Sequence, residues 1–181
     1  MRRLRITLWL AGFTAIIITP LMAASSASAD PPYQAWVNLD SGLCLTASGG
    51  QGSLVTQTAC PPAGASIPQA QQWNATCFNL FCNGGNFLKN KWNGLCAHVL
   101  GGAANETNIL SWPCSKISNQ RWSVTFPHIP SQILDQAFFL KSHVNNTDSH
   151  CLDVRTKNPG QQMQLWTCNF SKAQLFIGRP A

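Results

Sequence analysis

The hydrophobic pattern of this chain consists of short apolar runs separated by turn residues, after one longer apolar run near the amino terminus. Each short run is rich in aromatic or branched residues, and Gly, Pro and Asn cluster between the runs. No segment sustains the 3.6-residue period of an amphipathic helix, so the pattern predicts a small all-β domain. The predicted strands lie within QAWVNL (34–39), LVTQT (54–58), NFLKNKW (86–92), NILSW (108–112), FFLKSHV (138–144) and MQLWT (163–167).

The long apolar run belongs to a segment that differs from the rest of the chain. MRRLR is basic, LWLAGFTAIIITPLMAA is apolar, and SSASA ends in small residues. This three-part pattern is typical of a secretory signal peptide, with cleavage after Ala29. An uncleaved membrane anchor is the alternative, but the run is near the lower limit for spanning a bilayer. We therefore expect a signal peptide over residues 1–29 and one secreted, extracellular domain over 30–181, without membrane association after cleavage.

Three similar units follow one another along this domain. They begin with GLCLTA (42–47), GLCAHV (94–99) and HCLDVR (150–155), and they close with QQW (71–73), QRW (120–122) and QLF (174–176). We place the repeats at about 33–82, 83–134 and 135–181. Because a unit of this size cannot bury its apolar face alone, the three units are expected to pack on a common centre. The first unit carries an extra segment, PPAGASIP (61–68), which we expect on the surface.

The chain has eight cysteines, and six of them recur at matching positions of the three units. In an oxidising compartment they indicate disulfides, although the sequence alone permits 105 pairings. Three separations are nearly equal, which favours one bridge in each unit. A zinc site is the rival, but paired CxxC motifs are missing and the histidines are scattered. The predicted bridges are Cys44–Cys60, Cys96–Cys114, Cys151–Cys168 and, by remainder, Cys77–Cys82.

With its C-L-x starts, its aromatic residues before the second cysteine and its Q-x-W closures, the chain resembles the ricin B-chain type lectins, which include the family-13 carbohydrate-binding modules. The resemblance covers nearly all of residues 30–181. It implies an all-β β-trefoil of twelve strands, with a six-stranded barrel capped by three hairpins. Within that fold the closing aromatic residues Trp73, Trp122 and Phe176 are expected in the core, because large aromatics bury much area and recur here in threefold register.

The resemblance also indicates a sugar site in the third unit. An exposed aromatic ring can cover the apolar face of a pyranose, and a carboxylate and amides can bond its hydroxyls. The lectins place an aspartate, a polar residue, an aromatic and an Asn-Gln pair at set positions of each unit. The third unit matches these positions with Asp153, Gln164, Trp166 and Gln174, while Ala173 replaces the asparagine.

The other two units depart further from the lectin pattern. The second keeps Trp112, Asn119 and Gln120, but His98 replaces the aspartate and Leu110 the polar residue, so we expect a weaker site. A neutral imidazole offers one acceptor where a carboxylate offers two oxygens. The first unit has neither a ring nor a charge and is expected to be structural; its four residues are Thr46, Thr56, Thr58 and Ala70.

We therefore expect a secreted lectin module that binds a galactose- or xylose-type sugar in a glycan or polysaccharide, mainly through the third repeat. The alternative is a protein-binding trefoil, such as a protease inhibitor or toxin partner, whose sugar sites have degenerated. A separately encoded enzyme or toxin remains open as a partner. The lack of a basic cluster argues against nucleic acid, since the net charge of +6 includes three arginines of the signal.

Catalysis, metals and cofactors are not expected from the sequence. The six acidic residues do not recur between the units, and glycoside hydrolysis usually needs a facing pair of carboxylates. No hydrolase or metalloprotease motif occurs. The four histidines have no nucleophile at a recognisable spacing; they are His98, His128, His143 and His150.

Overall fold

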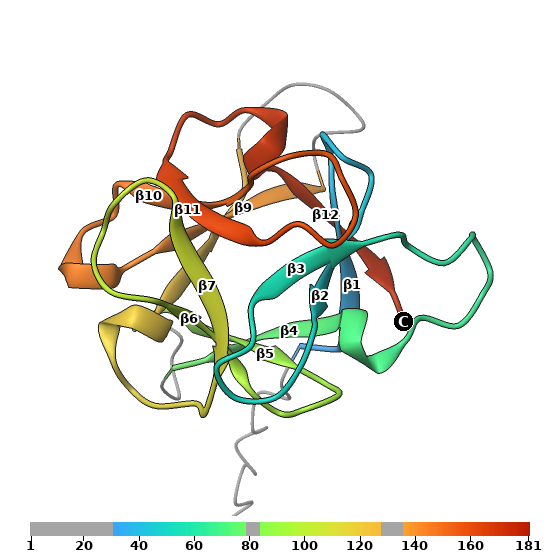
Figure 1. Cartoon of the computed structure of the whole chain (residues 1–181), viewed down its shortest axis with the longest axis horizontal. Coiled ribbons are helices and arrows are strands. Elements are labelled where there is room, and N and C mark those ends of the chain that lie inside the picture. Colours follow the sequence, from blue (N-terminus) through green and yellow to red (C-terminus); the bar gives the residue numbers. More distant parts are fainter. Residues whose placement is uncertain (1–30, 79–83, 128–135) are drawn as a thin grey trace, which may run out of the picture.

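A computed structural model describes residues 31–78, 84–127 and 136–181, and these residues form an all-β fold with four short 3-10 turns (Figure 1). The first repeat contributes β1 (Gln34–Asn38), β2 (Cys44–Ala47), β3 (Val55–Thr58), η1 (Gln69–Gln71) and β4 (Gln72–Cys77). The second contributes β5 (Asn86–Asn90), β6 (Cys96–Val99), β7 (Thr107–Trp112), η2 (Ser118–Gln120) and β8 (Trp122–Thr125). The third contributes β9 (Ala137–Ser142), η3 (Val144–Asn146), β10 (His150–Val154), β11 (Met163–Thr167), η4 (Lys172–Gln174) and β12 (Phe176–Pro180).

The outer two strands of each repeat close into a barrel. β1 pairs with β4, β4 with β5, β5 with β8, β8 with β9, β9 with β12, and β12 returns to β1. Every pairing is antiparallel, and the ring of six strands leaves no free edge, which removes a site of unwanted strand pairing. The predicted six-stranded barrel is confirmed.

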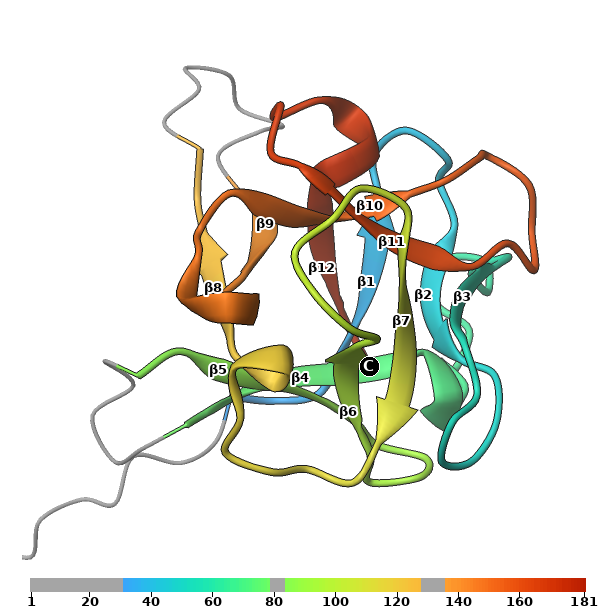
Figure 2. The same cartoon turned by 60° about the vertical axis from the view of Figure 1, so that its left-hand side comes forward.

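The inner two strands of each repeat form a hairpin, and the three hairpins cover one end of the barrel (Figures 1 and 2). β7 pairs with β11, while single bridges join Leu54 to Leu110 and Thr56 to Gln162. Each hairpin therefore contacts both of the others. This arrangement confirms the predicted β-trefoil.

The core contains the closing aromatic residue of every repeat. Trp73, Trp122 and Phe176 are fully buried, as predicted. Each indole also satisfies its N–H within its own repeat, since Trp73 Nε1 donates to the carbonyl of Leu45 at 2.9 Å and Trp122 Nε1 to that of Ala97 at 3.2 Å. A buried indole N–H without a partner would be costly, so these bonds fix how the rings lie.

Two buried asparagines connect neighbouring repeats: one joins the first repeat to the third, and the other joins the second repeat to the first. Asn38, at the end of β1, donates to the carbonyls of Ala173 and Leu175 in the third repeat. Asn90, at the end of β5, donates to the carbonyl of Gln72 and to that of the residue two before it in the first repeat. These bonds satisfy carbonyls at the 3-10 turns that precede β12 and β4.

Three of the four predicted disulfides are present. Cys44–Cys60, Cys96–Cys114 and Cys151–Cys168 each link the hairpin's first strand to the segment after its second strand. The fourth predicted bridge includes Cys82, which lies outside the described residues, as does the predicted signal peptide. Residues 61–68 are mostly exposed and project from the body of the fold, as expected, although Ile67 is buried (Figure 1).

Candidate functional site

The hairpin β10–β11 brings the carboxylate, one amide and the aromatic ring of the third repeat to one face. Asp153 lies opposite Gln164, and Cys151 lies opposite Trp166. Side chains two positions apart on a strand point to the same side, so Trp166 and Gln164 share the face on which Asp153 lies. This register therefore brings together the three side chains that stand apart in the sequence.

Asp153 and Gln164 form a buried polar pair. Gln164 Nε2 donates to Asp153 Oδ1 at 2.9 Å, and the two residues are only 6% and 5% exposed. Among the described residues, the other amide atom, Gln164 Oε1, is buried without a hydrogen-bond partner. A buried acceptor without a partner costs free energy, so a donor from a bound ligand would be favoured there.

Burial raises the pKa of the Asp153 carboxyl above its ordinary value, because a charged carboxylate loses water contacts. Hydrogen bonds from the amides of Gln164 and Gln174 oppose this rise, and the negative charge of Asp40 adds to it. A carboxylate that keeps its charge at neutral pH with little water around it is a strong hydrogen-bond acceptor.

Asp153, Gln164 and Trp166 line an open pocket of about 530 Å³. Trp166 is half-buried, so part of its ring remains available at the pocket wall. Ala173 also lines the pocket, at the position where the lectin pattern has an asparagine. The polar residues Asn169 and Ser171, from the loop that follows Cys168, stand beside it.

One wall of the pocket comes from another repeat and could not be found from the repeat pattern. Glu106, from the loop between β6 and β7, forms an ion pair with Arg155 at 3.2 Å across the rim. Asn105 anchors the same loop, since its side-chain oxygen accepts from the backbone N of Thr167 at 2.7 Å. The second repeat therefore supplies a wall of the third repeat's pocket, where the loop lies beside β11 (Figures 1 and 2).

Gln174, the fourth residue predicted for this site, is fully buried, and its bonds are mainly to backbone. Its Oε1 accepts from the backbone N of Asn169 at 2.9 Å and of Phe170 at 3.1 Å, and its Nε2 donates to the carbonyl of Thr167 at 3.0 Å. The side chain thus closes the loop that contributes Asn169 to the pocket. It shapes the site from behind the pocket wall.

In the second repeat a histidine, His98, stands where the third repeat has its aspartate, and its ring contacts an aromatic ring. The rings of His98 and Trp112 lie 5.8 Å apart at an angle of 31°. Burial lowers the pKa of His98, and its Nδ1 is buried without a partner in the part of the chain that the structure describes. Leu110 lies opposite His98 and adds no polar group. Trp112 remains 37% exposed.

The amides of the second repeat bond the protein itself. Asn119 Nδ2 donates to the carbonyls of Val99 at 2.9 Å and Gly101 at 2.8 Å. Gln120 is buried, accepts from the backbone N of Ser115 and donates to the carbonyl of Pro113. Gln120 therefore closes its loop in the same way as Gln174, and this site offers a ligand fewer polar groups than that of the third repeat.

In the first repeat, the position that corresponds to the sugar pocket is occupied by side chains that form a chain of hydrogen bonds. Gln71 Nε2 donates to Thr58 Oγ1 at 2.8 Å, Thr58 and Thr46 share a bond of 2.8 Å, and Thr46 Oγ1 donates to the carbonyl of Cys44 at 2.9 Å. Thr46 and Thr56 are buried. The hydroxyls of Thr46 and Thr58 thus already have partners within the repeat, which leaves them less available to a ligand.

Within residues 31–78, 84–127 and 136–181, no group of three or more His, Cys, Asp or Glu side chains is placed to hold a metal ion. In the same ranges, no helix is long and apolar enough to cross a membrane.

Residues 33–132 match the family model described as the ricin-type beta-trefoil lectin domain. The matched range holds the first two repeats, so the third repeat's pocket rests on the structure and on the repeat pattern. No curated protein matches the chain.

Several solved structures share the fold. The designed threefold-symmetric protein ThreeFoil is 18% identical, with a TM-score of 0.66 over 82% of this chain and 99% of its own. A ricin B-like lectin from Macrolepiota procera in complex with lactose is 18% identical, with a TM-score of 0.61 over 85% of this chain and 98% of its own. An exo-beta-1,3-galactanase from Clostridium thermocellum is 19% identical, with a TM-score of 0.67 over 84% of this chain but only 31% of its own.

Proposed function

This chain belongs to the ricin-type beta-trefoil lectin domain family, and from that premise we propose that it is a secreted module that binds a galactose- or xylose-type sugar in the pocket of its third repeat. The family and the fold support carbohydrate binding in general. The choice of repeat rests on the buried Asp153–Gln164 pair beside the half-buried ring of Trp166. The basic, apolar and small-residue pattern of residues 1–29 supports secretion.

Each of these side chains has a distinct task in the proposed complex. Trp166 covers the C–H face of the pyranose ring, which removes apolar surface from water. Asp153 accepts hydrogen bonds from sugar hydroxyls, and Gln164 Oε1 accepts a further one that satisfies its lone pairs. Their mutual bond at 2.9 Å holds both groups in place before the sugar arrives, so little side-chain entropy is lost on binding.

Asn169 is proposed to take over the role of the missing asparagine. Ala173 offers no polar group, whereas Asn169 lines the same pocket from a loop that Gln174 holds closed. An amide in this position supplies a hydrogen-bond donor that complements the acceptors of Asp153 and Gln164. The Macrolepiota procera lectin in complex with lactose supports a galactose-type ligand for a domain of this shape.

A glycan array with the chain from residue 30 onward tests the proposal. We expect binding to galactose- or xylose-terminated glycans that free sugar competes away, and a strong loss for Asp153→Asn, which replaces one acceptor oxygen by a donor. His98→Ala is the matched control in the second repeat and should retain most of the signal. Binding to a protein with no competition by sugar would favour the protein-binding alternative, for which the exposed 61–68 loop offers a surface.

Sugar binding is expected to weaken in acid. Burial raises the pKa of Asp153, so its carboxylate becomes protonated, and loses acceptor capacity, at a higher pH than an ordinary aspartate. The same shift acts on folding with the opposite sign. The folded state binds this proton more readily than the unfolded state, so the contribution of Asp153 to stability increases as the pH falls through the raised pKa. Affinity and thermal stability measured on the same samples separate the two effects, and an affinity that does not change with pH until the protein unfolds would contradict the assignment.

A further inference from the structure

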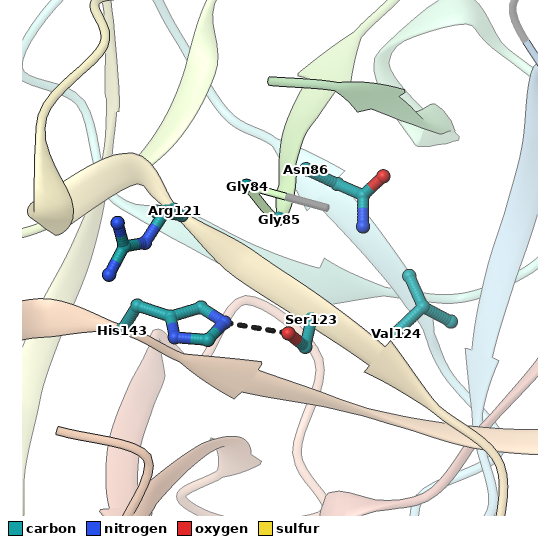
Figure 3. A pocket seen from close by; sticks show the side chains of 7 residues that line it. All are labelled: Gly84, Gly85, Asn86, Arg121, Ser123, Val124 and His143. Carbon is teal, nitrogen blue, oxygen red and sulfur yellow. Dashed lines mark hydrogen bonds between the residues drawn. The ribbon is translucent and has the colours of Figure 1, made fainter. Parts of the chain in front are cut away.

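A second pocket, of about 350 Å³, lies between β5, β8 and the turn that follows β9. Its lining differs from that of the sugar pocket, because it contains a hydroxyl, an imidazole and a guanidinium, from Ser123, His143 and Arg121 (Figure 3). These side chains come from the second and third repeats. The proposed glycan site does not use any of them.

The register of β8 and β9 brings the hydroxyl to the imidazole. Ser123 pairs with Lys141, and the backbone N of His143 donates to the carbonyl of Arg121. Ser123 and His143 are therefore diagonal neighbours on one face of the strand pair, within reach of each other. Ser123 Oγ and His143 Nε2 are 2.6 Å apart, and the dashed line in Figure 3 marks this hydrogen bond.

The turn after β9 supplies the third member. Asn145 and Asn146 have positive φ angles of 56° and 55°, a conformation that asparagine tolerates better than most residues, and the chain reverses there. The reversal returns Asp148 to His143, with Asp148 Oδ1 at 2.6 Å from His143 Nδ1. Asp148 is 57% exposed and His143 only 16%.

These two contacts fix the proton positions when the imidazole is neutral. A carboxylate can only accept, so His143 carries its proton on Nδ1 and donates it to Asp148. Nε2 is then a lone pair, and the hydroxyl of Ser123 must be the donor in the 2.6 Å bond. Serine, histidine and aspartate thus have the connectivity in which histidine acts as a general base toward the serine hydroxyl.

The charges around His143 favour the neutral form. Burial lowers the pKa of His143, and the positive charges of Arg121 and Lys141 lower it further, while the charge and the hydrogen bond of Asp148 oppose these effects. The net direction is downward, so the imidazole is a free base at neutral pH. A general base must be in this form to accept a proton.

We propose that Ser123 is an activated nucleophile that cleaves small carboxylic esters in this pocket, with His143 as the general base and Asp148 as its positioning residue. Ser123 Oγ attacks the ester carbonyl carbon while His143 Nε2 takes the hydroxyl proton. The tetrahedral intermediate collapses, the bond from carbon to the alcohol oxygen breaks, and the proton passes from His143 to the departing alcohol. Water, activated in the same way, then releases the carboxylic acid and regenerates Ser123.

The pocket has room and hydrogen-bond donors for such a substrate. Gly85 has a φ of +88°, and a Cβ there would lie 2.7 Å from Arg121 Cγ, so any other residue would crowd this wall. Asn86 also lines the pocket (Figure 3). Its Nδ2 donates one hydrogen to the carbonyl of Trp122 at 3.4 Å, and the other hydrogen can serve the carbonyl oxygen of the ester as it becomes negative. Arg121 also lines the pocket, where its Nη2 donates to the side-chain oxygen of Asn146 at 3.1 Å and holds the positive charge at this wall.

A fluorophosphonate probe tests the nucleophile, since it forms a covalent bond with activated serines only. We expect one label, mapped to Ser123 by peptide mass spectrometry, and none in Ser123→Ala. General-base catalysis is worth about 10²–10⁴-fold, so His143→Ala should slow labelling at least tenfold. The wild-type rate should fall only at a pH below the usual histidine range. Hydrolysis of p-nitrophenyl acetate should follow the same order.

Two further variants distinguish this activity from a folding effect and from glycan binding. Asp148→Asn changes an exposed side chain, so the protein should fold, yet labelling should slow because the tautomer of His143 is no longer fixed. Trp166→Ala should label at the wild-type rate, because it alters only the other pocket. Failure to label Ser123 in the folded wild type, or equal labelling in His143→Ala, would overturn the proposal and leave the proposed glycan binding untouched.

Discussion

Replacing Trp166 by alanine is expected to lower the affinity for a bound glycan by about ten- to hundredfold. The proposed complex places the pyranose face on this ring, and the lost apolar contact corresponds to about 1–3 kcal/mol. Trp166 is half-buried at the pocket wall, so the substitution removes contact area without opening the core. Isothermal titration calorimetry with a monovalent sugar, which avoids multivalent gains, gives the change directly.

The second repeat provides a matched control for this result. Trp112 occupies the equivalent position and is more exposed, but its neighbours are His98 and Leu110 in place of a carboxylate and an amide. Trp112→Ala should therefore change the measured affinity much less than Trp166→Ala. If the larger loss falls on Trp112→Ala, the working site lies in the second repeat. A titration that shows three equal sites would contradict the proposal that binding occurs mainly in the third repeat.

Trp73→Ala is expected to destabilise the fold by about 3–5 kcal/mol, the range for truncating a large aromatic residue in a packed core. Trp73 has no exposed surface and stacks on Trp36 with 6.2 Å between ring centroids. Its loss also leaves the carbonyl of Leu45 without its 2.9 Å bond. Guanidinium denaturation with the disulfides intact measures the change in the free energy of unfolding.

An exposed tryptophan of the same chain is the control for Trp73. Trp92 is 52% exposed, so Trp92→Ala should change the free energy of unfolding by no more than about 0.5 kcal/mol. For a domain of this size, the loss at Trp73 corresponds to a fall in Tm of about 6–20 °C. A Trp73→Ala protein as stable as Trp92→Ala would mean that the closing aromatic residues do not carry the core.

The loop-closing glutamines illustrate the limit of prediction from a motif. Gln120 and Gln174 stand in the motif expected at a sugar site, and the sequence places them there correctly. Only the structure shows that both are buried and bond mainly to the backbone of their own loops. Residues of a motif can be recurrent because they hold a loop, and recurrence alone does not distinguish a contact residue from a support.

The sequence by itself determined a small all-β domain of three repeats and three of its disulfides, and its resemblance to the ricin-type lectins implied the trefoil and the aromatic core. Their signals are local and occur three times, as the near-equal cysteine loops and the closures ending at Trp73, Trp122 and Phe176 show. The resemblance also assigned Asp153, Gln164 and Trp166 to one site, and the structure brings them to one face because the two strands of their hairpin pair in a single register.

Only the tertiary structure decided the contacts between repeats. Glu106 reaches the pocket of the third repeat from a loop of the second, and Asn38 bonds carbonyls more than 130 positions away. Ser123, His143 and Asp148 form no sequence motif; they meet because β8 pairs with β9 in one register and the following turn reverses the chain. A shift of one residue would turn Ser123 to the other face of the sheet. Such contacts depend on how the three units pack against one another, and this packing is a property of the closed barrel as a whole.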